Sequence, residues 1–220
     1  MTMATPTLSL PTTATIDMTP QGHGDRSVYR TEGDRFGAGR LGMVLFLGSL
    51  AMLFGATILA IVAIRLDENA WPRNLPPLPV AVWISTGLLL LSSATMQWGV
   101  VASRHGAVNI TRIAMLCTLF LGVGFLVSQT IAWFDWNTAI QVMVERDEAA
   151  GLAVTGFHVL TGIHAAHVIG GLIPLGVIAY LVVFISWSVE RSRGIYYTAM
   201  YWHFLDLVWV ALVITLVLVL

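Results

Sequence analysis

Charged side chains are scarce in this sequence of 220 residues, of which 10% are charged and 57% are hydrophobic. Soluble domains carry about a quarter charged residues, so this composition excludes an ordinary soluble domain and indicates an integral membrane protein. Lysine is absent, and a formal net charge of −1 argues against a nucleic-acid partner. The single cysteine, Cys117, excludes an intrachain disulfide and a thiolate metal cluster.

Long apolar runs are what the sequence has instead. Five runs are each long enough for the roughly 20 residues that a membrane-spanning helix needs; they cover residues 41–64, 79–102, 113–134, 152–187 and 195–220. None shows the period-two alternation of strands in an outer-membrane barrel. The sequence therefore predicts an all-α integral membrane bundle of five transmembrane helices over residues 40–220, preceded by a polar, mostly disordered cytoplasmic tail over residues 1–39.

Arginines are distributed unevenly about these runs. One side holds eight of them, at positions 26, 30, 35, 40, 104, 112, 191 and 193, and the other side holds three, at positions 65, 73 and 146. Cytoplasmic segments of membrane proteins carry the excess of arginine and lysine. This bias predicts a cytoplasmic N-terminus and a C-terminus outside, which agrees with five spans.

Histidines interrupt the fourth run, in the stretches "GFHVL" and "TGIHAAHVIGGLIPLG". On a helix that turns by about 100° per residue, His164 and His167 share one face while His158 points elsewhere. Three roles are open to imidazoles in such a run: binding a metal or haem, hydrogen bonding within the fold, or contact with another subunit.

The last run begins with "YYTAMYWHFLDLVWV", which contains the only acidic residue deep within a span, Asp206. Trp202, Asp206 and Trp209 fall on one helix face, with His203 beside them. At about 1.5 Å per residue, His203 and Asp206 lie roughly 10–15 Å from the cytoplasmic boundary, level with Ser92 and Ser93 of the second run. Because a carboxylate in lipid is costly, we expect Asp206 to pair with His203, with one of these serines or with a neighbouring subunit. Ordinary core packing is the alternative role for the two tryptophans.

A second polar layer is expected farther from the cytoplasm. The same rise places His167 roughly 24 Å and Gln129 of the third run roughly 25 Å from the boundary. Equal depth predicts that Gln129 lies near His164 or His167, and that Gln129→Leu costs about 0.5–2 kcal/mol.

The histidine depths also bear on cofactors. A haem held by two histidines needs imidazoles from facing helices at one depth, whereas His167 and His203 differ by roughly 10 Å. A metal ion needs three or four converging ligands, and only His164 and His167 converge. We therefore expect no catalytic, cofactor-binding or metal-binding residue here, and assign the histidines to structural hydrogen bonds or subunit contact.

Five stretches in order resemble the cytochrome c oxidase subunit III family of the haem–copper terminal oxidases, in its five-helix bacterial form. They are "RLGMVLFLGSLAMLFG", "LLLLSSATMQ", "LGVGFLVSQ", "LTGIHAAHVIGG" and "YWHFLDLVWV". The resemblance covers nearly all of residues 40–220. It implies a subunit without redox centres, in the bacterial plasma membrane, which docks on catalytic subunit I. It also implies that the chain holds structural phospholipids and supports proton uptake and complex stability.

Further partners implied by the resemblance are subunit II and a small subunit IV, with haem and copper in the partner subunits. This sequence departs from the family at Leu50 and Ala132, where relatives usually carry glutamates, and it lacks the first two of the seven helices usual in mitochondrial members. Three rivals stay open. They are the equivalent subunit of a quinol oxidase or nitric oxide reductase, a free-standing haem-binding membrane enzyme, and a small transporter, which should show inverted repeats.

Overall fold

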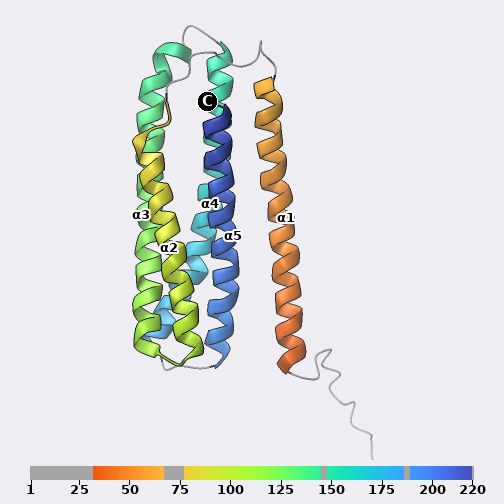
Figure 1. Cartoon of the computed structure of the whole chain (residues 1–220), viewed down its shortest axis with the longest axis vertical. Helices are drawn as coiled ribbons and strands as arrows, with labels where there is room; N and C mark the ends of the chain where they lie inside the picture. Colours follow the sequence, from red (N-terminus) through yellow and green to blue (C-terminus); the bar gives the residue numbers. More distant parts are fainter. Residues whose placement is uncertain (1–31, 67–76, 145–147, 186–188, 220) are drawn as a thin grey trace, which may run out of the picture.

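Five long helices make up the fold in the computed structural model, which describes residues 32–66, 77–144, 148–185 and 189–219. The helices are α1 (Glu32–Leu66), α2 (Val80–Arg104), α3 (Val108–Val144), α4 (Glu148–Phe184) and α5 (Val189–Val219) (Figure 1). Each is long and apolar enough to cross a membrane, and the described ranges contain no strand. The predicted all-α membrane bundle of five transmembrane helices is confirmed.

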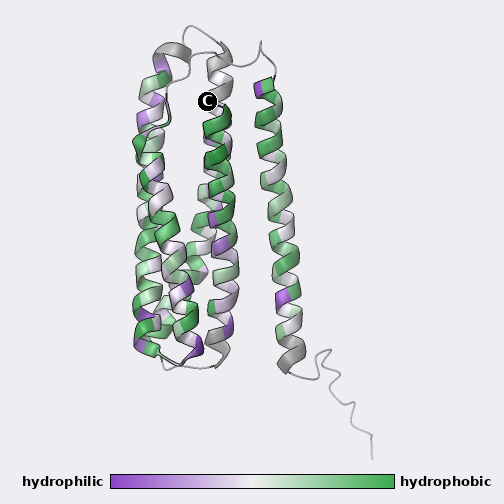
Figure 2. Cartoon of the chain, in the orientation of Figure 1, coloured by the Kyte–Doolittle hydropathy of each residue, from purple (hydrophilic) through white to green (hydrophobic). Residues whose placement is uncertain are grey.

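Helices α2 to α5 form a four-helix bundle, and α1 lies on its outside. Contacts run from α2 to α3, α3 to α4, α4 to α5 and α5 back to α2, whereas α1 packs chiefly on α5 and to a smaller extent on α4. Figure 1 shows α1 standing beside the other four along its whole length. Hydrophobic residues cover all five helices, and hydrophilic ones lie mainly near the helix ends (Figure 2).

The turn between α2 and α3 shows how the chain reverses direction within a few residues. Gly106 adopts a φ of 69°, which a side chain would disfavour, and the N–H of Ala107 donates to the carbonyl of Ala102 at 3.0 Å. A Cβ added at Gly99 would contact the Met115 side chain, so α2 and α3 approach closely.

Helices α1 and α3 extend furthest beyond their predicted apolar runs, because of tertiary contacts. Helix α1 begins at Glu32, so residues 32–39, which the sequence placed in the polar tail, are helical, and residues 1–31 lie outside the described ranges. The carbonyl of Phe36 accepts a hydrogen bond from the Tyr197 hydroxyl at 3.1 Å, which ties this first part of α1 to α5. Helix α3 continues to Val144 because Trp136 and Ile140 are still buried against the bundle.

Candidate functional site

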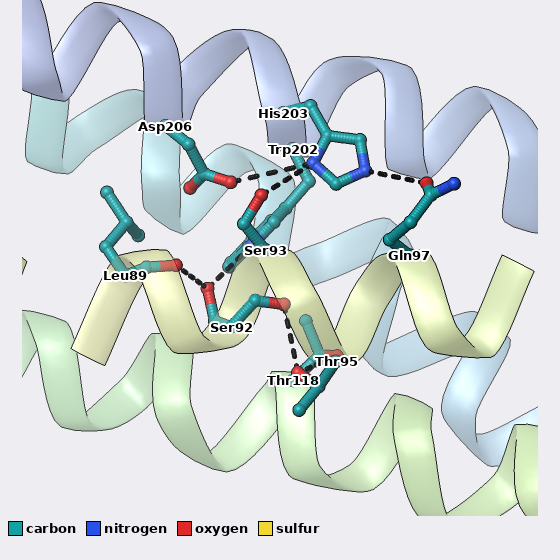
Figure 3. A network of polar contacts seen from close by, with 9 residues as sticks. All are labelled: Leu89, Ser92, Ser93, Thr95, Gln97, Thr118, Trp202, His203 and Asp206. Carbon is teal, nitrogen blue, oxygen red and sulfur yellow. Dashed lines mark hydrogen bonds and ion pairs between the residues drawn. The ribbon is translucent and has the colours of Figure 1, made fainter. Parts of the chain in front are cut away.

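A polar network joins α2 and α5 at the level of Ser93. Nδ1 of His203 lies 2.7 Å from Oγ of Ser93 and 3.8 Å from Oδ2 of Asp206. Nε2 of the same ring lies 3.3 Å from Oε1 of Gln97. We call Ser93, Gln97, His203 and Asp206 the inner network. Figure 3 shows the His203 ring with Gln97 at one edge and Ser93 and Asp206 at the other.

The hydrogen positions in the inner network follow from its acceptors. With its amide oxygen facing the ring, Gln97 accepts a hydrogen bond from the protonated Nε2 of His203. The other nitrogen of a neutral ring then accepts from the Ser93 hydroxyl. Asp206 is 5% exposed and receives no hydrogen bond from the described residues, so its carboxyl is held by its place beside His203.

Trp202 occupies the centre of the bundle next to this network. Its indole N–H donates to Oγ of Ser92 at 2.9 Å, and that hydroxyl donates to the Leu89 carbonyl at 2.7 Å (Figure 3). A Cβ added at Gly122 of α3 would lie 2.8 Å from the Trp202 ring, and one at Gly171 of α4 would lie 3.3 Å from it. Three helices therefore enclose this ring.

The paired histidines of α4 face α1 and the bundle interior. His164 is fully buried among the rings of Phe54, Phe125 and Trp209, with centroids 6.1, 5.7 and 5.0 Å away. His167 bonds the Ile163 carbonyl of its own helix through Nδ1 at 2.7 Å and packs 5.2 Å from Phe54. Both imidazoles thus help to dock α1 on α4.

The predicted hydrogen bond between Gln129 and these histidines is wrong. Gln129 is buried, but its Oε1 faces the Ser85 hydroxyl of α2 at 3.5 Å, and its Nε2 has no partner among the described residues. Neither ring nitrogen of His164 has one. Equal depth did not pair these groups. The Gln129 amide oxygen faces Ser85 of α2, and Phe125, one turn earlier on the same face of α3, packs its ring against His164.

This geometry changes the expected effect of Gln129→Leu. The substitution removes a buried amide nitrogen that has no partner, so the free energy of unfolding should stay unchanged or rise by up to about 1 kcal/mol. Ser128→Ala is the matched control because its hydroxyl donates to the Ala81 carbonyl at 3.0 Å, and it should lose about 0.5–1.5 kcal/mol. Thermal unfolding of the purified protein measures both, and an equal loss in Gln129→Leu would contradict the expectation.

Some partners were missed by the sequence analysis. The Trp209 indole N–H donates to the Thr86 hydroxyl of α2 at 3.0 Å. Gln97 contacts Nε2 of His203 through its amide oxygen. Thr86 lies seven residues, or about two helical turns, before Ser93, which places both on the same face of α2. That spacing was the available signal, but threonine also bonds its own helix backbone, as Thr86 does at 2.7 Å to Val82.

Two hollows flank the first half of α1. The larger, of about 680 Å³, lies between α1, α4 and α5 and is lined almost wholly by apolar side chains, among them Met43, Phe46 and Val177. The smaller, of about 360 Å³, lies where α1, α2 and α5 meet and contains Phe36, Arg104 and Arg193. Among the described residues no group of three or more His, Cys, Asp or Glu side chains converges on one point.

Known proteins are similar to this chain over most of its length. A family model described as Cytochrome c oxidase subunit III matches residues 23–219. A protein of Corynebacterium diphtheriae named cytochrome c oxidase subunit 3 is 31% identical over 176 residues, which are 79% of this chain and 80% of the relative. Proteins with the same name from Bacillus subtilis and Mus musculus are each 28% identical, over 77% and 80% of this chain and 81% and 68% of their own lengths. The chain therefore belongs to the cytochrome c oxidase subunit III family.

Proposed function

We propose that the chain is the non-redox subunit III of a bacterial haem–copper terminal oxidase that passes electrons from cytochrome c to oxygen. The match of the family over residues 23–219 carries this proposal, and relatives named for cytochrome c, including bacterial ones, favour that donor over quinol. Its partners are catalytic subunit I, subunit II and a small subunit IV, and the haem and copper lie in these partner subunits.

The intramembrane histidines support a role without a bound haem or metal. Both ring nitrogens of His203 are engaged by Ser93 and Gln97. His167 uses Nδ1 on its own helix, and so does His158, at 2.9 Å from the Val154 carbonyl. His203 thus has no ring nitrogen left for a ligand. His158 and His167 keep Nε2, which can bind a metal or haem when Nδ1 bonds a carbonyl, but no group of three or more His, Cys, Asp or Glu side chains converges among the described residues.

Structural phospholipids form the second part of the proposal. The larger hollow is open between α1 and the α4–α5 pair, and its lining is apolar, which suits acyl chains within the bilayer. Lipids held there would support stability and proton uptake in the catalytic subunit.

The two lost family glutamates limit the role of this subunit in proton transfer. Leu50 is 7% exposed and Ala132 is 0% exposed, so each lies where a carboxyl would need a buried partner. Neither position can carry a proton here. Any support for proton uptake must therefore come from docking and lipid binding.

Purification of the tagged chain from native membranes in mild detergent tests the function. We expect the catalytic subunit to co-purify, with a haem spectrum and oxidation of cytochrome c, and the chain to be colourless once it is separated from its partners. Haem that remains with the separated chain would instead show a haem-binding enzyme.

The topology is proposed from the arginine bias, with the N-terminus in the cytoplasm of the bacterial cell and the C-terminus outside. A tag on the N-terminal tail should react only from the cytoplasm and a tag after Leu220 only from outside, measured with an impermeant label on intact cells and inverted vesicles. Detection of both tags on one side would refute this topology.

A further inference from the structure

Polar side chains reach the outer surface of the bundle between α2 and α5, within the spans. The His203 side chain is 35% exposed, and Gln97 beside it is exposed. Along the same two helix faces, Leu90 lies two turns before Gln97 and Leu207 one turn after His203, and these leucines are 51% and 68% exposed. We call this surface the α2–α5 face.

Lipid does not suit the centre of this face. Hydrocarbon offers no hydrogen bond to the Gln97 amide nitrogen, whereas a neighbouring helix can. Most other exposed hydroxyls in the spans are satisfied locally; the Thr130 hydroxyl on α3, for example, donates to the Leu126 carbonyl at 2.8 Å. The α2–α5 face therefore differs chemically from the outward sides of the other helices.

Positive charge lies at one end of the same face. The smaller hollow is lined by Arg104 at the end of α2, Arg193 near the start of α5 and Phe36 of α1, with Cζ of Arg193 6.0 Å from the centre of the Phe36 ring. At about 1.5 Å per residue, these arginines lie roughly 10–15 Å along the bundle from Gln97 and His203. A helix packed on the face would meet the polar centre and the arginines in turn.

We propose that the α2–α5 face is the surface on which a transmembrane helix of the catalytic subunit docks. This inference rests on the proposed function. That helix presents a carboxylate to Arg104 in the smaller hollow and a hydrogen-bonding side chain to the amide nitrogen of Gln97. Both side chains lie on one side of the helix, roughly 7–10 residues apart, as the rise of 1.5 Å per residue requires. The exposed Leu90 and Leu207, which lie on the other side of the polar centre from the arginines, supply the apolar contact.

Site-specific photocross-linking in the assembled complex tests the docking face. A benzophenone amino acid replaces Leu207 or Leu90, which lie next to the polar centre, on the side away from the arginines, without belonging to it. Val127 on the outward side of α3, 56% exposed, is the matched control. We expect the probes on the α2–α5 face to cross-link to the catalytic subunit several-fold more than the control, on a peptide with the carboxylate spacing given above.

Substitutions in the native complex provide a second measurement. Gln97→Leu should weaken retention of the chain by about threefold, the effect of one average interhelical hydrogen bond in a membrane. Arg104→Glu should reduce retention further, and reversal of the cross-linked carboxylate to arginine should restore it. Failure of that charge reversal to restore retention would overturn the proposed pairing.

The outcomes separate the two proposals. If the chain co-purifies with the oxidase but the Leu207 and Leu90 probes label only lipid or a second copy of this chain, the docking face is wrong and the function stands. If probes on both sides label the catalytic subunit equally, the α2–α5 face has no special role and the inference is overturned. If no oxidase co-purifies with the unmodified chain, the proposed function fails and the docking face fails with it.

Discussion

Replacement of Trp202 by alanine is expected to lower the free energy of unfolding by about 3 kcal/mol, near the lower end of the range for buried tryptophans. The side chain is 1% exposed and fills the space between α2, α3 and α4. Lipid tails are as apolar as the bundle interior, so lost packing dominates this cost and the transfer term is small. The loss should appear as a lower melting temperature of the purified complex and poorer retention of this subunit.

Two control variants separate packing from hydrogen bonding. Trp202→Phe keeps most of the ring but loses the N–H that donates to Ser92, so about 1 kcal/mol should be lost. Trp98→Ala removes a tryptophan that is 51% exposed and should change stability least. If the melting temperature of Trp202→Ala equals that of Trp98→Ala, the Trp202 ring is not the centre of the bundle packing.

The fold could be predicted from composition and length because the bilayer restricts the choices. Runs of about 20 apolar residues must form helices that satisfy their own backbone, and five such runs gave five helices. Helix ends were less predictable, since α3 continues past the apolar run where Trp136 packs on Phe157, with ring centroids 3.9 Å apart. A contact of this kind depends on the neighbouring helix, which no single run reveals.

Depth along the membrane could also be predicted, but rotation about each helix axis could not. His203 and Asp206 do lie level with Ser93, as the rise per residue indicated. The partner of Gln129 was predicted wrongly, because equal depth leaves open which neighbour a side chain faces. Side-chain partners therefore required the packing order of α2 to α5, which the sequence does not state.

Helix α1 lies outside the four-helix bundle, and aromatic side chains make many of its contacts with α4 and α5. The Phe54 side chain of α1 is 2% exposed because it packs against His164 and His167 of α4. Phe46 of α1 stacks on Tyr201 of α5, with ring centroids 6.0 Å apart. Arg65 at the far end donates from Nε to the Val219 carbonyl at 2.9 Å. Contacts at these three levels hold α1 to the bundle, and the larger hollow lies within the part of the interface near Phe46.

Asp206 is the remaining residue for which two roles make opposite predictions. Intramembrane carboxylates often carry protons, but a relay needs successive titratable sites or an ordered water chain. Within the inner network the only other titratable side chain is His203, and Leu50 and Ala132, where the resemblance implies glutamates in relatives, cannot ionise. We therefore propose that Asp206 is structural and packs beside Nδ1 of His203, next to the docking face.

Asp206→Asn and Asp206→Leu distinguish these roles. Asparagine keeps the shape and hydrogen-bonding capacity beside His203 while removing ionisation, so oxidase activity and proton pumping should remain near normal. Leucine places an apolar group against Nδ1 of His203, which lies 3.8 Å from the carboxylate, and should release the ring and cause loss of subunit association. Retention of the chain on purification and proton ejection by reconstituted vesicles measure the two effects. An Asp206→Asn variant that assembles fully yet no longer pumps would show that ionisation of this carboxyl, rather than its place in the packing, is what the oxidase requires.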